Sequence, residues 1–284
     1  MSKIHEALQR ANLAADQLTA ITAADNIVAP NEPVEIACVD ISRPRSKRRE
    51  VRSASFDVRL GSPLVPFEGK DPRAGEQYRI LRTRIIQHSL QPRVIVVSSA
   101  APGDGKSTTA VNLAFALALR PDVKVLLIDA DIRRGTIGPD LGIGPSPGLA
   151  EYLAETCELS DVTVECANLP NLHVIPAGQV HANPCELLDS DRWRSTCMSV
   201  RNTYRFVIVD SPPIGAVADY ELLQSVADGV LLIMRPDNTK RHLALRALEG
   251  VPKAKLIGVV LNGMEGWFVG DQDVYGARYY EQKP

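Results

Sequence analysis

The fold is decided by the stretch Ser98-Ser-Ala-Ala-Pro-Gly-Asp-Gly-Lys-Ser-Thr-Thr109. An apolar, β-branched run at residues 93–99 precedes it, and an apolar helical pattern at residues 106–120 follows. Between a strand and a helix, a glycine-rich turn can point backbone N–H groups at phosphate oxygens, and the helix N-terminus adds partial positive charge. The general pattern is GxxxxGK followed by Ser or Thr, and this stretch departs from it only at Ala100. We therefore predict a nucleotide-binding P-loop.

The residues of this loop have distinct expected contacts. Lys106 can reach the β- and γ-phosphates, and the Ser107 hydroxyl can bind magnesium. A glycine-rich turn without a ligand is the alternative, and it accounts poorly for Gly-Lys-Ser-Thr at a strand–helix junction. We expect ATP and Mg²⁺ as cofactors, with nucleotide contacts from Pro102, Gly103, Asp104, Gly105, Lys106, Ser107 and Thr108.

Carboxylates follow two later apolar runs. Asp129 and Asp131 come after the run at residues 123–128, and Asp210 comes after the run at residues 206–209. Ligands of parallel sheets bind at the carboxyl ends of the strands, so these carboxylates should face the P-loop. Asp also caps helices and starts turns, which makes one such residue weak evidence and two strand ends stronger. We predict magnesium ligands among Ser107, Asp129, Asp131 and Asp210, and catalytic roles for Lys106, Asp129, Asp131 and Asp210.

The pattern after residue 73 predicts an α/β fold. Strand-like runs that are apolar throughout alternate with helical stretches, which indicates a mostly parallel sheet with helices on both faces. The further expected strands are residues 172–175, 206–209, 229–235 and 256–261, and the further helices are residues 149–153, 185–201, 219–226 and 238–248.

Composition excludes several classes of function. The formal net charge of −2 gives no global field for nucleic acid. The five cysteines form no CxxC pair, the five histidines show no HExxH spacing, and no apolar run is long enough to cross a bilayer. The first residues lack the apolar core of a signal peptide. We expect a cytoplasmic protein with no nucleic-acid partner.

The sequence divides into four regions that differ in composition and in hydrophobic pattern. Residues 1–19 are expected to form an amphipathic docking helix, and residues 20–72 a flexible linker with prolines and a basic run at residues 42–52. The basic run is interpreted first as a solvated charged segment and second as a site of peripheral contact with anionic lipid. Residues 73–270 are the expected nucleotide-binding domain, and residues 271–284 a flexible tail.

Three motifs resemble those of one family. They are Ala101-Pro-Gly-Asp-Gly-Lys-Ser107, Leu127-Ile-Asp-Ala-Asp-Ile-Arg-Arg134 and Val209-Asp-Ser-Pro-Pro213. Together they resemble the A, A′ and B motifs of the bacterial tyrosine kinases (BY-kinases), in the CpsD/CapB-like group that governs capsule and exopolysaccharide synthesis. The resemblance extends over roughly residues 73–280. It implies a P-loop NTPase fold with deviant Walker motifs, as in MinD and ParA, and ATP-dependent autophosphorylation on tyrosine.

The resemblance also implies roles for residues outside the P-loop. Glu76, Arg79 and Arg82 match the ExxRxxR helix that joins subunits of the family in a ring, although a solvated charged face is the plainer interpretation. Asn262 matches a base-contacting position, and a turn-forming Asn-Gly pair is the alternative. The expected acceptors of autophosphorylation are Tyr275, Tyr279 and Tyr280.

The family context implies a partner as well. Without a membrane-spanning segment of its own, the chain resembles the split arrangement, in which a transmembrane polysaccharide co-polymerase supplies an activating cytoplasmic segment. That would hold the kinase at the inner face of the plasma membrane. Two departures from the family pattern leave the efficiency and number of phosphorylation sites open, namely Gly135 in place of proline and a short tyrosine cluster.

Two other functions are compatible with a P-loop. A MinD/ParA-type switch ATPase usually has a second lysine five residues before the loop lysine, and that position is Ala101 here. A catalytically weak regulator that binds ATP for polysaccharide assembly would retain the same nucleotide ligands. The tyrosines of the tail have no role in the first of these alternatives.

Overall fold

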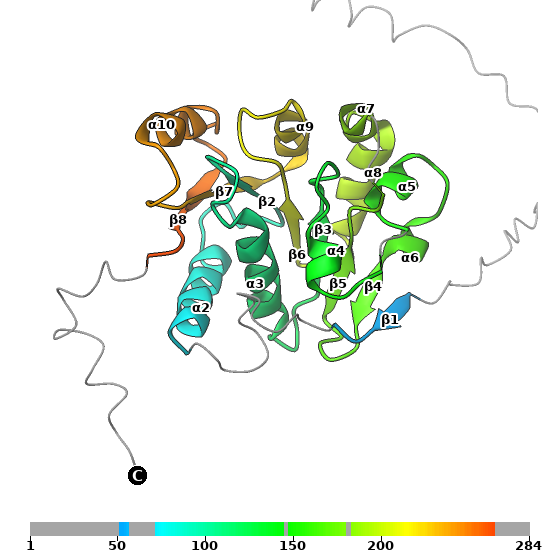
Figure 1. The fold of residues 1–284 in the computed structure, drawn as a ribbon. Coiled ribbons are helices and arrows are strands. Elements are labelled where there is room, and N and C mark those ends of the chain that lie inside the picture. Colours follow the sequence, from blue (N-terminus) through cyan, green and yellow to red (C-terminus); the bar gives the residue numbers. More distant parts are fainter. Residues whose placement is uncertain (1–50, 57–71, 145–146, 180–182, 265–284) are drawn as a thin grey trace, which may run out of the picture. The chain divides into compact units, whose positions relative to one another are not determined.

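The computed structural model describes residues 51–56, 72–144, 147–179 and 183–264. All of them lie within one compact unit, Arg48–Pro284, which is built on a sheet with strand order β1-β4-β5-β3-β6-β2-β7-β8 (Figure 1). Neighbouring strands are parallel except for β4 and β5, so the predicted mostly parallel sheet is confirmed. The strands are β1 (Arg52–Ala54), β2 (Val94–Ser99), β3 (Val125–Asp129), β4 (Val164–Cys166), β5 (Leu172–Ile175), β6 (Phe206–Asp210), β7 (Gly229–Met234) and β8 (Leu256–Leu261).

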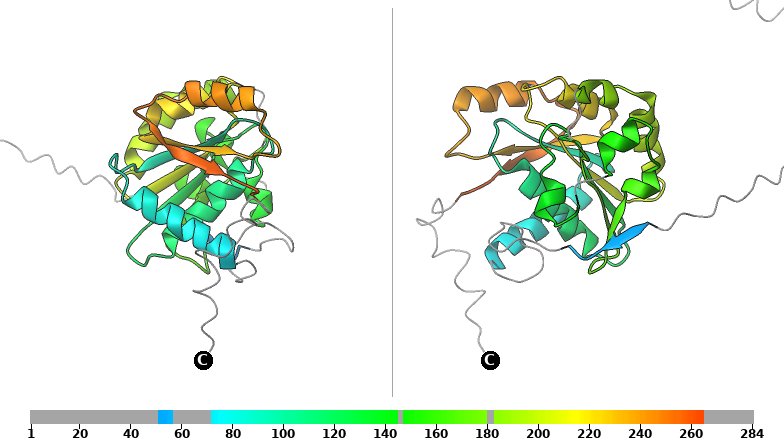
Figure 2. Two further views of the ribbon diagram at one scale, coloured as in Figure 1. Left: turned by 90° about the vertical axis from the view of Figure 1, so that its left-hand side faces the viewer. Right: turned by 45° about the vertical axis from the view of Figure 1, so that its right-hand side comes forward.

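Helices cover both faces of the sheet, as the two views of Figure 2 show. Three of them pack in one apolar layer against alternate residues of the central strands: α2 (Pro72–Ile86), α3 (Lys106–Ala118) and α4 (Ile137–Asp140). The opposite face is covered by α5 (Leu149–Leu153), α6 (Leu159–Val162), α7 (Pro184–Leu188), α8 (Asp191–Val200), α9 (Asp219–Val226) and α10 (Arg241–Glu249).

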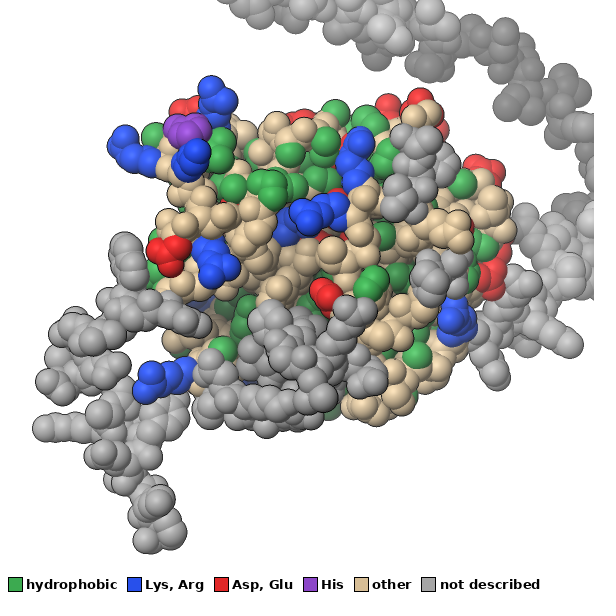
Figure 3. All heavy atoms as spheres, in the orientation of Figure 1, with side chains coloured by type: hydrophobic (Ala, Val, Ile, Leu, Met, Phe, Trp, Pro, Cys, Tyr) green, Lys and Arg blue, Asp and Glu red, His purple; other side chains and the backbone are tan. Residues whose placement is uncertain are grey.

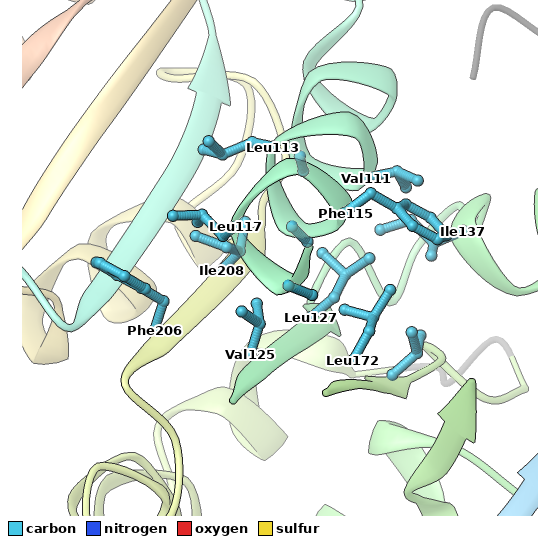
Figure 4. Close-up of a cluster of buried hydrophobic side chains, with 14 of the residues drawn as sticks. Val111, Leu113, Phe115, Leu117, Val125, Leu127, Ile137, Leu172, Phe206 and Ile208 are labelled. Atoms are coloured by element: carbon cyan, nitrogen blue, oxygen red, sulfur yellow. The ribbon is translucent and has the colours of Figure 1, made fainter. Parts of the chain in front are cut away.

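The central strands are apolar throughout because both of their faces are buried. Every residue of β2, β3, β6 and β7 is buried, and successive side chains of a strand point to opposite faces. Val125 and Leu127 of β3 therefore pack with Phe115 of α3 (Figure 4), whereas Leu126 of the same strand belongs to the opposite layer with Trp193. This is the pattern of a parallel sheet between two helical layers.

Part of the expected linker is folded. Residues 51–56 lie inside the segment 20–72, yet β1 pairs in parallel with β4, and Phe56 is buried with its ring edge-on to Phe115 at 6.4 Å between centroids. The linker prediction is therefore wrong for these residues. The strand could not be recognised in the sequence, because Arg52 and Ser53 are exposed and the segment shows no apolar alternation. The docking helix 1–19, most of the linker and the tail 271–284 lie outside the described residues.

The helix expected at residues 185–201 is two helices. Ser190 separates α7 from α8, and its hydroxyl accepts a hydrogen bond from the N–H of Trp193 at 3.2 Å. Serine is favoured at this capping position because it satisfies an N–H that the first turn leaves unpaired. Within the part of the chain that is described, none of the helices has the length and apolar character needed to span a membrane.

Candidate active site

The strand order brings the predicted loops together. β6 lies between β3 and β2, so that Asp129 is beside Asp210 in register and Asp210 is beside Val97. Because these strands are parallel, their carboxyl ends lie at the same edge of the sheet. The P-loop after β2, the segment after β3 and the segment after β6 therefore meet at one site, as the sequence predicted.

Two glycines give the P-loop its shape. Gly103 and Gly105 have φ of +85° and +90°, a region that L side chains rarely adopt. Gly105 is also the N-cap of α3, and a Cβ on it would lie 2.0 Å from the side-chain nitrogen of Asn262. Only glycine fits at this position, so the loop can curl closely into the first turn of the helix.

Lys106 lies at the centre of a charged cluster. Its Nζ is 2.9 Å from Asp131 Oδ2 and 3.4 Å from Asp210 Oδ2, and it donates to Ser107 Oγ at 3.1 Å. Burial lowers the pKa of Lys106, but the charges of Asp210 and Asp131 outweigh it and raise the pKa above its usual value. The lysine is therefore a fixed positive charge at the N-terminus of α3.

Two buried carboxylates each keep one oxygen unpaired. Asp129 Oδ2 accepts a hydrogen bond from the N–H of Ile137 at 3.0 Å, and Asp210 Oδ2 accepts one from Ser107 Oγ at 2.5 Å. The Oδ1 atoms of both carboxylates have no hydrogen-bond partner among the described residues. Burial raises the pKa of Asp129 to about 8, with the charge of Asp210 adding to it, and burial raises the pKa of Asp210 to about 6 although Lys106 opposes this.

These carboxylates would fit a magnesium ion that is also bound by substrate phosphates. Unpaired buried carboxylate oxygens are costly, and a cation beside them removes the cost. No group of three or more His, Cys, Asp or Glu residues is arranged to hold a metal by itself within the described ranges. Magnesium is usually bound by one or two carboxylates together with waters and substrate phosphates. The Ser107 hydroxyl beside Asp210 provides a further oxygen at the same place.

Two predicted nucleotide contacts lie against the loop itself. The Asp104 side chain is fully buried and accepts hydrogen bonds from within the protein, so only its backbone N–H remains for a phosphate. The side chain of Asn262 donates to the Asp104 carbonyl at 2.9 Å. Its contact with adenine remains a prediction.

Sequence reasoning missed two residues next to Asp104. Asn238 and Thr239 follow β7 and donate to the Asp104 carboxylate. A polar pair after a strand end was the available signal, but residues 238–248 were expected to be helical, and α10 begins only at Arg241.

An ion pair beside the A′ segment was also missed. Arg133 bonds Asp219 through Nε at 2.8 Å and through Nη2 at 3.0 Å, and Asp219 is the fully buried first residue of α9. The pair joins the segment after β3 to the helix that follows the B segment. Arg133 stands within the quoted motif at residues 127–134, but nothing in the sequence identified its partner.

The other predicted residues lie away from this site. On α2, Arg79 is exposed and Glu76 is half-buried, and the two bond each other at 2.7 Å. Arg82 Nη1 donates instead to the Ala116 carbonyl near the end of α3, at 3.0 Å, and so anchors α2 to the helix that begins at the P-loop. The tyrosines Tyr275, Tyr279 and Tyr280 lie outside the described residues.

Known proteins are similar to this chain in sequence and in fold. A family model described as an AAA domain matches residues 92–254. The tyrosine-protein kinase YwqD of Bacillus subtilis is 37% identical over 207 residues, covering 72% of this chain and 86% of that protein. The tyrosine-protein kinase CpsD of Streptococcus agalactiae is 33% identical over 213 residues, covering 73% of this chain and 92% of that protein. A solved structure, the kinase domain of the Escherichia coli tyrosine kinase ETK, matches with a TM-score of 0.65 at 31% identity, covering 78% and 84%.

The fold and the site define a P-loop NTPase of the AAA-domain class. Within that class, the chain belongs to the family of bacterial tyrosine-protein kinases. The family and the enzyme class predicted from the three motifs are therefore confirmed.

Proposed function

We propose that the chain transfers the γ-phosphoryl group of ATP to tyrosines of its own tail. The observation that carries the proposal is the cluster of Lys106, Ser107, Asp131 and Asp210 at the start of α3, in a chain of the tyrosine-kinase family. Phosphoryl transfer depends mainly on positioning and on neutralising charge, and this cluster supplies groups for both.

Each part of the site has a role in this reaction. The N–H groups of residues 102–108 and the Lys106 ammonium bind the phosphates. Ser107, Asp129, Asp131 and Asp210 are the candidates that hold Mg²⁺, which when bound neutralises negative charge on the transferring group. Asp129 or Asp131 orients the attacking tyrosine hydroxyl or accepts its proton.

The proposed acceptors are within reach of the site. Asn262 follows β8 and contacts the P-loop, so the last described residues lie beside the loop. Tyr275 comes 14 residues after Leu261 (275 − 261), and an extended segment of that length spans up to about 46 Å. The tail can therefore serve its own site or that of a second copy. Tyr279 and Tyr280 are the further proposed acceptors.

We propose a ring of copies joined through α2. Arg79 is exposed, Glu76 is half-buried and Ile80 is 39% exposed, and a shallow depression of about 440 Å³ lies over this part of the helix. A charged helix face with an apolar residue at its centre suits a contact between copies. The bond from Arg82 to Ala116 supports a different task for that residue, which is to fix α2 on α3.

We propose further that the kinase acts in capsule or exopolysaccharide synthesis at the inner face of the plasma membrane, with a transmembrane polysaccharide co-polymerase as activator. The family motifs support the pathway and the partner. Basic side chains support contact with an anionic surface. One group is the run at residues 42–52, and another lies over α10, at the upper left of Figure 3, where Arg241, His242 and Arg246 are exposed.

The test is incubation of the purified full chain with ATP and Mg²⁺, followed by anti-phosphotyrosine blotting, with and without a candidate activating segment. We expect a signal that Lys106→Met abolishes and that combined Phe substitutions at Tyr275, Tyr279 and Tyr280 reduce sharply. Tyr78→Phe in α2 is the matched control and should keep the signal. A signal that survives Lys106→Met would refute the proposal. ATP hydrolysis stimulated by DNA or lipid, without phosphotyrosine, would favour the switch ATPase, and ATP binding without turnover would favour the regulator.

A further inference from the structure

Four side chains form a hydrogen-bond network that holds the P-loop. The carboxylate of Asp104 is fully buried and accepts three hydrogen bonds, each of 2.8 Å. The donors are the N–H of Ala101, the amide of Asn238 and the hydroxyl of Thr239, all neutral groups. Asn262 adds a bond to the Asp104 carbonyl at 2.9 Å. We call Asp104, Asn238, Thr239 and Asn262 the loop brace.

The brace joins the P-loop to the turn between β7 and α10. Besides its bond to Asp104, the Asn238 amide donates to the Pro102 carbonyl at 2.9 Å. The Thr239 hydroxyl also accepts from the N–H of Arg235 at 2.9 Å, and the Thr239 N–H donates to the Arg235 carbonyl at 2.6 Å. The Asn238 amide nitrogen therefore donates twice to the loop, and the Thr239 hydroxyl bonds to both the loop and the turn.

The P-loop needs such support because of its own sequence. Gly103 and Gly105 have positive φ, and glycine loses more conformational freedom than any other residue when it is ordered. Pro102 and Gly103 are exposed, so core packing does not order this part of the loop. A ligand site whose donors are already oriented binds more tightly, because the ligand does not have to order the loop when it binds.

A carboxylate is the side chain that satisfies this arrangement. Three donors point at Asp104, and an ionised carboxylate only accepts. Asparagine has nearly the same shape, but its NH₂ group would face at least one of these donors. The network therefore depends on the chemistry of residue 104 and not merely on its size.

We infer that the side chains of Asp104, Asn238 and Thr239 set the MgATP affinity of the P-loop by positioning it, without themselves touching the nucleotide. The inference rests on the proposed function in one respect, that ATP is the ligand. Because the brace orders the loop before and during phosphoryl transfer, it contributes binding energy to both states. Its loss should raise the KM for ATP more than it lowers kcat.

The first experiment measures MgATP binding to the full chain by titration calorimetry and the steady-state constants of tyrosine phosphorylation. We expect Asp104→Asn and Thr239→Val each to weaken binding by about 10-fold, the order expected when a hydrogen bond to a charged group is lost. Thr239→Ser keeps the hydroxyl and should bind within about twofold of wild type, a margin smaller than the loss of a hydrogen bond. Asp237→Asn, in the same turn but exposed and outside the brace, is the matched control. Urea unfolding of each variant checks that it folds.

A second set of variants tests the charge. Asn238→Asp sets a second carboxylate against Asp104 and should bind MgATP more weakly than Asn238→Ala, whereas a purely structural role predicts equal losses. The exchange Asp104→Asn with Asn238→Asp restores one donor–acceptor pair and should bind more tightly than Asn238→Asp alone. The inference is overturned if Asp104→Asn and Thr239→Val bind within twofold of wild type, if Thr239→Ser loses as much as Thr239→Val, or if Asn238→Asp and Asn238→Ala bind equally. Absence of MgATP binding by wild type would instead refute the proposed function.

Discussion

Replacing Arg133 with methionine removes the cation that Asp219 faces at the start of α9. The two residues are joined by bonds of 2.8 and 3.0 Å, and the Asp219 side chain is only 1% exposed. Removing one partner of a fully buried pair costs about 3–5 kcal/mol, because the other charge is left without compensation. The Arg133 side chain is 41% exposed, so water can take over part of its task. We therefore expect Arg133→Met to lower the free energy of unfolding by about 1.5–3 kcal/mol.

A second variant separates the effect of losing the Arg133–Asp219 contact from the effect of leaving the Asp219 carboxylate without a cation. In Arg133→Met with Asp219→Leu, no buried carboxylate remains, so the double variant should be more stable than Arg133→Met alone. Unfolding in urea, followed by circular dichroism, measures all three proteins. Arg134→Met is the matched control, since Arg134 is exposed, and its effect should stay within about 0.5 kcal/mol. A loss below that limit for Arg133→Met, or a double variant at least as unstable as the single one, would refute the reasoning.

Two further predictions concern stability. Phe56→Ala should lower the free energy of unfolding in urea by about 3–5 kcal/mol, because it empties a buried aromatic site. Arg52→Ala, at an exposed residue of the same segment, should lower it little. Equal losses in the two variants would show that residues 51–56 do not pack as described. Burial would raise the pKa of Asp228, but bonds from the Val94 N–H and Arg201 outweigh it and hold the pKa below its usual value. The folded pKa is thus below the unfolded one, so this stability is present above about pH 4 and is lost as pH falls further. Asp228→Asn should flatten the decline in urea midpoint between pH 5 and pH 3, and an unchanged slope would contradict the assignment.

The core of the site was predictable because it depends on local pattern. Apolar runs that end in Ser99, Asp129 and Asp210 identify buried parallel strands, and parallel strands end at the same edge of a sheet. No knowledge of strand order was needed to bring the three loops together. The P-loop sequence then fixes where Lys106 and Ser107 stand, at the first turn of α3.

The rest depends on partners that are far apart in the sequence. Asp104 could be assigned to the nucleotide from its place in the motif, but its side chain is bound by Asn238, 134 residues later. In the same way, Arg133 binds Asp219 across 86 residues. β1 could not be predicted because its three residues bury little, and the segment packs on the core mainly through Phe56, with Ala54 beside it. Pairings of this kind leave no periodic signal within a short window.

The aspartates near this edge of the sheet differ in whether other groups of the protein satisfy their carboxylates, which residue type alone does not show. Asp104 is satisfied by neutral donors, Asp131 by Lys106, and Asp219 by Arg133. Asp129 and Asp210 each retain a buried oxygen without a hydrogen-bond partner in the described part of the chain, and burial raises the pKa of both carboxyl groups. Buried polar atoms without partners lower the stability of a fold unless a ligand satisfies them. Asp129 and Asp210 lie opposite each other on paired strands, and Asp210 lies beside the Ser107 hydroxyl, so we expect a cation bound there to increase the stability of the fold.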